Sequence, residues 1–270
     1  MTHWAILVAP LVLASFVMLF AFVGCGLDSS GLGGVEEYAT DVTDNSNSIS
    51  YWRLGEAAGA TTAADSKNGN PGTYTGGVTL GSPGLVVNDT NTAATFDGST
   101  GFVEVPRKDD SLNPPAFTVE ALVNVAGGDG QFRAVVSSRD VDADTNRLGY
   151  ILYANDQNKW EAWVGDGTAW HQVTGPDVTP GVHYVAMTYD KTTLKLYVDP
   201  LEDAPATMDV PYQPNATRGL RIGAGANESD PPLYFFNGVI DEVAVYDAPL
   251  SFNVLKAHFQ LARTGSSTGG

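Results

Sequence analysis

Cysteine and basic residues are the scarcest features of this sequence. The only cysteine, Cys25, excludes an intrachain disulfide and a thiolate cluster for zinc or iron and sulfur. Lys and Arg number 14 against 31 Asp and Glu, which gives a formal net charge of -17. Because nucleic-acid phosphates are bound through Lys and Arg, this charge excludes a nucleic-acid partner. Stability must come from packing, and a hydrophobic content of 43% is sufficient for a sizeable core.

The sequence also lacks the motifs of common enzyme classes. It has no phosphate-binding loop and no dinucleotide fingerprint. Some enzymes that cleave polysaccharides with two carboxylates on one strand face resemble one another in a Glu-x-Asp-x-x-Glu motif, and this sequence has none. His171, His183 and His258 each stand apart from any nucleophile motif. We therefore expect no catalytic residues, and a polysaccharide-cleaving enzyme is the least favoured function.

The N-terminus carries an addressing or anchoring segment. No charged residue occurs from Trp4 to Gly24, a run close to the ~20 residues that cross a bilayer as a helix. Phe-Val-Gly-Cys at 22–25 resembles the bacterial lipoprotein signal, and this resemblance implies lipidation of Cys25. Phe22 replaces the usual Leu, so an uncleaved anchor and an ordinary cleaved signal stay open. All three alternatives place the rest of the chain outside the cell, at the envelope or the extracellular surface.

The spacing of turn residues divides the chain into four parts. Residues 1–25 form the signal peptide or anchor, and Gly and Ser predict a flexible tether over 26–44 and a flexible tail over 264–270. Between them, Gly, Asn, Asp and Pro recur about every ten residues and separate short apolar runs, which is typical of an antiparallel sandwich or jelly roll. We expect one all-β domain over 45–263, with an N-terminal hydrophobic helix and a short C-terminal helix that starts after Ser251.

Two hairpins are legible within that domain. Residues 182–189 alternate in polarity and are followed by the turn 190–193 and a second strand over 194–198. Residues 149–153 and 160–164 form a similar pair around a polar turn. Both hairpins predict antiparallel pairing.

Several motifs resemble one known family. Ser-Tyr-Trp-Arg-Leu-Gly-Glu at 50–56, Ala-Thr-Phe-Asp-Gly at 94–98 and Phe-Asn-Gly-Val-Ile-Asp-Glu-Val-Ala-Val-Tyr at 236–246 occur in the order found in laminin-G-like, concanavalin-A-like jelly rolls. The resemblance implies a two-sheet antiparallel sandwich whose first and last strands are neighbours. It does not imply a ligand, because this architecture serves binding modules, adhesins and viral tail proteins alike.

The same resemblance implies a structural calcium ion near the ends of the domain. The matching residues are Asp65, Asn68 and Asn70 in one loop and Asp241 in the closing motif. Calcium takes about six to eight oxygen ligands, and these side chains with nearby carbonyls offer suitable oxygens. The alternative is that Asp65 and Asn68 only form a turn.

Aromatic residues identify the candidate ligand site. Sugar rings stack on Trp and Tyr, and the densest group contains Trp163, Trp170, Tyr153 and His171. Strand alternation prevents Trp160 and Trp163 from facing the same way, so one of them belongs to the core. The aromatic run 231–236 either lines a rim or fills the core.

The sequence therefore predicts a non-catalytic extracellular binding or adhesion module, anchored in a membrane, which recognises a glycan or surface polymer. The alternative is a structural surface or virion-decoration protein that binds no glycan. Calcium is the expected cofactor.

Overall fold

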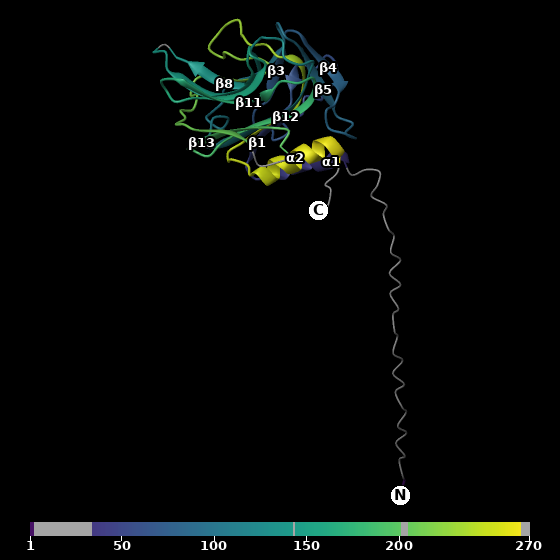
Figure 1. The fold of residues 1–270 in the computed structure, drawn as a ribbon. Helices are drawn as coiled ribbons and strands as arrows, with labels where there is room; N and C mark the ends of the chain where they lie inside the picture. Colours follow the sequence, from purple (N-terminus) through teal and green to yellow (C-terminus); the bar gives the residue numbers. More distant parts are fainter. Residues whose placement is uncertain (3–33, 143, 201–204, 266–270) are drawn as a thin grey trace. The chain divides into compact units, whose positions relative to one another are not determined.

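The computed structural model describes residues 1–2, 34–142, 144–200 and 205–265 (Figure 1). The chain divides into two units, Met1–Gly31 and Leu32–Gly270, and the second contains all the described helices and strands. The predicted hydrophobic helix, Cys25 and nearly all of the signal or anchor segment 1–25 lie outside the described residues. No helix of the described part combines the length and the hydropathy needed to cross a membrane.

The second unit is a sandwich of two antiparallel sheets, as the sequence predicted. Sheet A has the order β14 (Ala206–Asp209), β13 (Thr193–Val198), β12 (Gly181–Tyr189), β7 (Phe117–Val125), β16 (Asn237–Tyr246), β5 (Thr92–Asp97) and β4 (Val78–Pro83), and β1 (Ser48–Trp52) also pairs with β16. Sheet B has the order β11 (Trp170–Asp177), β10 (Lys159–Gly165), β9 (Arg147–Ala154), β8 (Arg133–Val141), β15 (Leu220–Ile222), β6 (Phe102–Val105), β3 (Gly72–Thr75) and β2 (Thr62–Ala63).

The main core lies between the two sheets. Its largest side chains include Trp52, Trp160, Phe96, Phe117 and Phe236, all of them almost completely buried. Alternation places the strand residues among them on the inner faces, and Phe236 directly precedes β16; all of them remove apolar surface from water. The sandwich therefore needs no disulfide.

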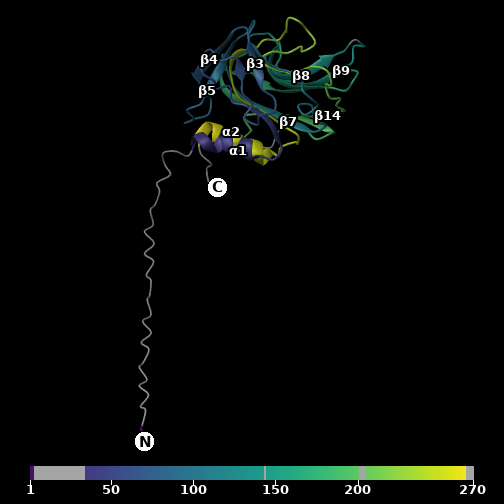
Figure 2. The same cartoon turned by 180° about the vertical axis from the view of Figure 1, so that it is seen from behind.

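Two helices form a third layer against the outer face of sheet A. Helices α1 (Gly34–Asp44) and α2 (Phe252–Thr264) lie side by side beneath the sandwich in Figures 1 and 2. Tyr38 and Val42 of α1 and Leu255 and Phe259 of α2 are buried in a second apolar cluster against the sheet. Because this layer covers sheet A, most of its central strand β7 is buried on both faces.

The domain starts earlier in the chain than the sequence predicted. The expected tether over 26–44 is too long, because residues 34–44 form α1 and the domain starts there. Tyr38 and Val42 are four residues apart and fully buried, so they give α1 its apolar face. The predicted tail over 264–270 is also slightly too long, since Thr264 ends α2 and Gly265 caps it with a φ of 69°.

The other local predictions are confirmed. Both hairpins pair antiparallel, β12 with β13 and β9 with β10. The first and last strands, β1 and β16, are neighbours, as the family resemblance implied. The short C-terminal helix is α2, and the Ser251 side chain accepts a hydrogen bond from the amide of Val254 at its N-terminus.

Candidate functional site

The candidate site lies on the outer face of sheet B, where strands β9, β10 and β11 are neighbours. Trp160 points inward and is completely buried, whereas Trp163, three residues later, points outward and is half-buried. In the ladder, Trp163 stands between Ile151 of β9 and Gln172 of β11. Alternation therefore decides which of the two tryptophans belongs to the core, as the sequence predicted.

Five aromatic side chains gather on this face, and we call them the aromatic surface: Phe132, Tyr153, Trp163, Trp170 and Tyr234. The ring centroids of Tyr153 and Trp163 are 5.5 Å apart, and those of Trp163 and Trp170 are 6.4 Å apart. Phe132 lies 5.6 Å from Tyr153 and 5.5 Å from Tyr234. These spacings are in the range of direct ring contacts, so the five rings form one chain of contacts.

Arg139 of β8 closes that chain into a ring. Its guanidinium lies 4.8 Å from the centroid of Trp170 and 5.9 Å from that of Tyr234. Its Nε donates to Glu228 at 3.1 Å, and its second nitrogen contacts the other oxygen of the same carboxylate. This bidentate pair ties the loop that carries Glu228 and Tyr234 to the sheet.

Glu161 fixes the orientation of Trp163. Its carboxylate is almost completely buried and accepts from Trp163 Nε1 at 2.8 Å, Asn155 Nδ2 at 2.7 Å and Thr174 Oγ1 at 2.8 Å. A buried carboxylate with three donors is well satisfied, and it holds the indole ring in a single position. The aromatic surface is thus a preorganised platform.

His171 does not belong to that platform. Its neighbours Trp170 and Gln172 are on the outer side of β11, so alternation turns His171 away from it. Its Nε2 lies 2.7 Å from Asp166, which also accepts from the amides of Thr168 and Ala169. The amide of Ala169, then His171 and the amide of Thr168, lower the pKa of Asp166 to about 2. His171 and Asp166 therefore hold the turn between β10 and β11.

The structure thus brings together three of the four predicted ligand-binding residues: Trp163 and Trp170 are half-buried, whereas Tyr153, which contacts Trp163, is only 5% exposed. Sequence reasoning missed Arg139 and Glu228, which are far apart in the chain. The aromatic run 231–236 was expected either to line a rim or to fill the core, and it does both. Tyr234 belongs to the aromatic surface, and Phe236 is fully buried in the core.

The loop of the predicted calcium ligands is filled by its own backbone. Asp65 Oδ1 accepts from the amides of Tyr51 and Lys67, and Oδ2 accepts from those of Gly69 and Asn70. Asn68 has a φ of 60°, which fits a turn residue. The side-chain amide of Asn70 donates to Ser50 Oγ, and the backbone carbonyl of Asn70 accepts from Trp52 Nε1. The Asp65 carboxylate thus bonds to four backbone amides, and calcium at this loop stays a prediction.

Asp241 lies in a different environment. It is almost completely buried in β16, and its Oδ2 accepts from the amide of Leu85 while its Oδ1 has no partner. The adjacent Glu242 is bound by Arg53, whose guanidinium also contacts Asp89. The positive charge that pairs with Glu242 and Asp89 is therefore that of Arg53. Within the described ranges, no three His, Cys, Asp or Glu side chains converge as metal ligands.

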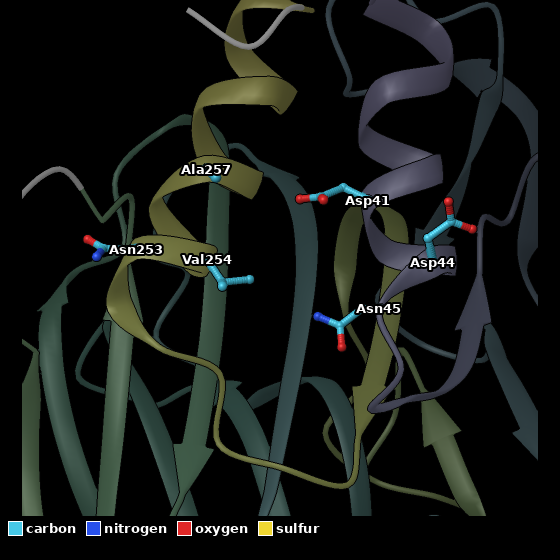
Figure 3. Close-up of a pocket in the computed structure, with 6 residues that line it drawn as sticks. All are labelled: Asp41, Asp44, Asn45, Asn253, Val254 and Ala257. Carbon is cyan, nitrogen blue, oxygen red and sulfur yellow. The ribbon is translucent and has the colours of Figure 1, made fainter. Parts of the chain in front are cut away.

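A hollow lies between the two helices. It is lined by Asp41, Asp44 and Asn45 at the end of α1 and by Asn253, Val254 and Ala257 of α2. In Figure 3, Asp41 extends from α1 into the space beside α2. Its carboxylate pairs with His258 at 3.2 Å, so the hollow marks the joint between the helices and has fewer features of a ligand site than the aromatic surface.

A family model describes most of the sandwich. The model of the concanavalin A-like lectin/glucanases superfamily matches residues 96–253, more than half of the chain. The chain belongs to this superfamily. No curated protein matches the sequence.

Solved structures of the superfamily fold extend the comparison. A mutant of Trypanosoma rangeli sialidase with trans-sialidase activity matches with a TM-score of 0.57 and 14% identity over 82% of this chain and 34% of its own. Botulinum neurotoxin type C, in a structure on its interaction with two ganglioside molecules, matches with a TM-score of 0.59 and 10% identity over 81% and 52%. This chain spans about a third of the length of the sialidase.

One further solved structure is matched over nearly its whole length. Domain 4 of AbnA, an extracellular arabinanase of Geobacillus stearothermophilus in complex with arabinotriose, has a TM-score of 0.51 and 20% identity over 80% of this chain and 98% of its own. At these identities the matches show the concanavalin A-like fold alone. That fold occurs both in proteins named as enzymes and in domains solved with glycans.

Proposed function

We propose that this chain is a non-catalytic glycan-binding module that uses the aromatic surface of sheet B. The observation that carries the proposal is the closed ring of five aromatic side chains and Arg139 on one sheet face. Flat rings of this kind stack on the apolar faces of sugars, and the exposed Gln172 and Thr174 beside Trp163 offer hydrogen bonds to hydroxyl groups. The glycan complexes of structures with this fold support the same class of ligand.

The aromatic surface and the first element of the domain lie on opposite sides of the sandwich. The aromatic surface is on the outer face of sheet B, whereas α1 lies against sheet A (Figure 1). If residues 4–24 anchor the chain in a membrane, or if Cys25 is lipidated, the domain is held at the cell envelope. We therefore propose an envelope-attached module whose aromatic surface lies on the side of the sandwich opposite α1.

The carboxylates of the site support a non-catalytic role. Glycosidases need one carboxyl group free to donate a proton and a second free to attack or to activate water. Glu161 is occupied by three donors, Glu228 by Arg139, and Asp166 by two amides and His171. Each of these carboxylates has a structural task, and a polysaccharide-cleaving activity is the less favoured function.

Removing two indole rings tests the binding function. We expect Trp163→Ala and Trp170→Ala each to weaken glycan binding by about 30-fold, equivalent to about 2 kcal/mol, because large aromatic anchors dominate binding free energy. The measurement is a glycan array followed by titration calorimetry on the best ligand. Phe252→Ala is the control, since this half-buried ring lies in the helical layer on the opposite side. Equal affinities in all four proteins would reject the aromatic surface as the site.

The structural alternative predicts a different result in the same experiment. A surface or virion-decoration protein would bind no glycan on the array and would self-assemble in sedimentation measurements. Binding by the parent protein that depends on Trp163 and Trp170 distinguishes the two functions.

Calcium binding stays a prediction, and Asp241 is its best remaining ligand because Oδ1 is buried without a partner. If the domain binds calcium there, the melting temperature measured by calorimetry is higher in millimolar calcium chloride than in EDTA. Asp241→Asn should abolish this difference, whereas Asp65→Asn should lower the melting temperature equally in both buffers. An identical melting temperature of the parent protein in both buffers would reject calcium.

A further inference from the structure

We infer that the aromatic surface selects neutral glycans and disfavours glycans that carry carboxylate or sulfate groups. This inference rests on the proposed glycan binding and adds the ligand class. It comes from the charges around the ring of aromatic side chains, and from which of them are already paired.

The one cation within the ring is already neutralised. Both Arg139 nitrogens that face Glu228 are bound to its carboxylate, and the flat side of the guanidinium rests on Trp170. Arg139 is also more than nine-tenths buried. A ligand carboxylate would have to compete with Glu228 for a guanidinium that is largely shielded from water, so binding of an anionic sugar there is disfavoured.

Two neighbouring guanidinium groups are paired with carboxylates as well. Arg221 binds Glu104 at 2.7 Å, and Arg218 binds Asp140 at 3.1 Å. Glu161 and Glu228, the two carboxylates that bind side chains of the ring, outnumber the single guanidinium of Arg139.

The net charge of the whole chain acts in the same direction. At -17, the chain repels a polyanion at long range, and the local carboxylates repel it within the screening length of about 8 Å at physiological salt. A neutral sugar meets no such penalty, because stacking on Trp163 and Trp170 needs no opposite charge. The site is therefore matched to uncharged polysaccharides or oligosaccharides.

Matched pairs of probes test this inference. We expect lactose or a neutral galactan to bind at least about tenfold more tightly than sialyllactose or polygalacturonate at low salt, and the difference to shrink as salt screens the repulsion. Titration calorimetry at two ionic strengths measures both effects. If an acidic probe binds as tightly as its neutral partner, the inference is overturned while glycan binding stands. If no probe binds, including neutral arabino- and xylo-oligosaccharides, the proposed function fails and the inference with it.

Releasing Arg139 gives an independent test. Glu228→Gln removes the carboxylate partner, and we expect it to shift the ratio of acidic to neutral affinity at least about tenfold toward the acidic probe. Asp110→Asn is the matched control, because it makes the same charge change at an exposed ion pair with Arg107 outside the aromatic surface. Thermal unfolding shows whether both variants fold. An equal shift in both variants would mean that net charge alone, and not Arg139, sets the preference, and would overturn the inference at this site.

Discussion

Replacing His258 with alanine is expected to lower the free energy of unfolding by about 3–5 kcal/mol, because it leaves a buried carboxylate without its cation. That carboxylate is Glu120 of β7, which is fully buried between sheet A and the helices. It accepts from His258 Nδ1 at 3.0 Å, from Tyr246 Oη at 2.7 Å and from Tyr184 Oη. Burial by itself lowers the pKa of His258, but the attraction of Glu120 and the pairing with Asp41 outweigh it and raise the pKa to about 10.

The charged state of His258 is therefore part of the fold at neutral pH. A raised histidine pKa stabilises the folded state fully below the unfolded value of 6.5, and this contribution is lost as the pH rises toward about 10. Urea unfolding at pH 6 measures the expected loss in His258→Ala. Lys256→Ala, two residues earlier at a partly exposed position of α2, should change stability by less than about 1 kcal/mol.

A double variant separates the loss of charge balance from the loss of packing. Glu120→Gln in the His258→Ala background removes the uncompensated charge, so we expect the double variant to be more stable than His258→Ala alone. Strictly additive losses would contradict the coupling between the two groups.

Asp241→Asn is expected to stabilise the domain above pH 7, by about 2–4 kcal/mol relative to the parent protein. Burial, partly offset by the amide of Leu85 and by Arg53, raises the pKa of Asp241 from 3.8 to about 7. A raised carboxyl pKa means that the folded state holds the proton more tightly, and each pKa unit corresponds to about 1.4 kcal/mol. Its contribution is complete below about pH 4 and is lost as the pH rises through about 7. Asparagine keeps the neutral, hydrogen-bonding form at every pH.

The measurement is the unfolding free energy of both proteins from pH 4 to pH 9, with the difference plotted against pH. Asp97→Asn serves as the opposite control: Asp97 accepts from the amides of Ser99, Thr100 and Gly101, and these hydrogen bonds outweigh desolvation and lower its pKa. The Asp97 variant should therefore lose stability at neutral pH. A flat difference curve for Asp241→Asn would show that Asp241 stays ionised in the folded state.

The sequence was sufficient for features that depend on local pattern. Alternation placed Trp160 in the core and Trp163 outside, and the Ser251 cap marked the start of α2. The sequence did not predict helix α1, because Tyr38 and Val42 give it only a short apolar stripe beside a Gly- and Ser-rich segment. The apolar stripe favours a helix and the neighbouring composition favours a flexible tether. Contact with α2 and sheet A stabilises the helix.

The composition of the site depends on long-range pairing that no local pattern contains. Arg139 and Glu228 are 89 positions apart in the sequence. They meet because β15, which precedes the loop of Glu228, pairs with β8, which carries Arg139. The surroundings of the Asp65 loop also depend on long-range pairing. Its residue types suit a metal, and in the structure the Asp65 carboxylate accepts from backbone amides of β1 and of the loop itself.

The layered arrangement also determines how the domain carries mechanical load. The chain enters through α1, and the aromatic surface lies two layers away on the outer face of sheet B. Tension between residue 34 and a ligand held there pulls first on the contact between α1 and α2, where Asp41 meets His258. It then reaches β1, which is paired to β16 along its length. If the domain is held at residue 34 and by a bound ligand, we expect α1 to detach from α2 before the strands of the sandwich separate.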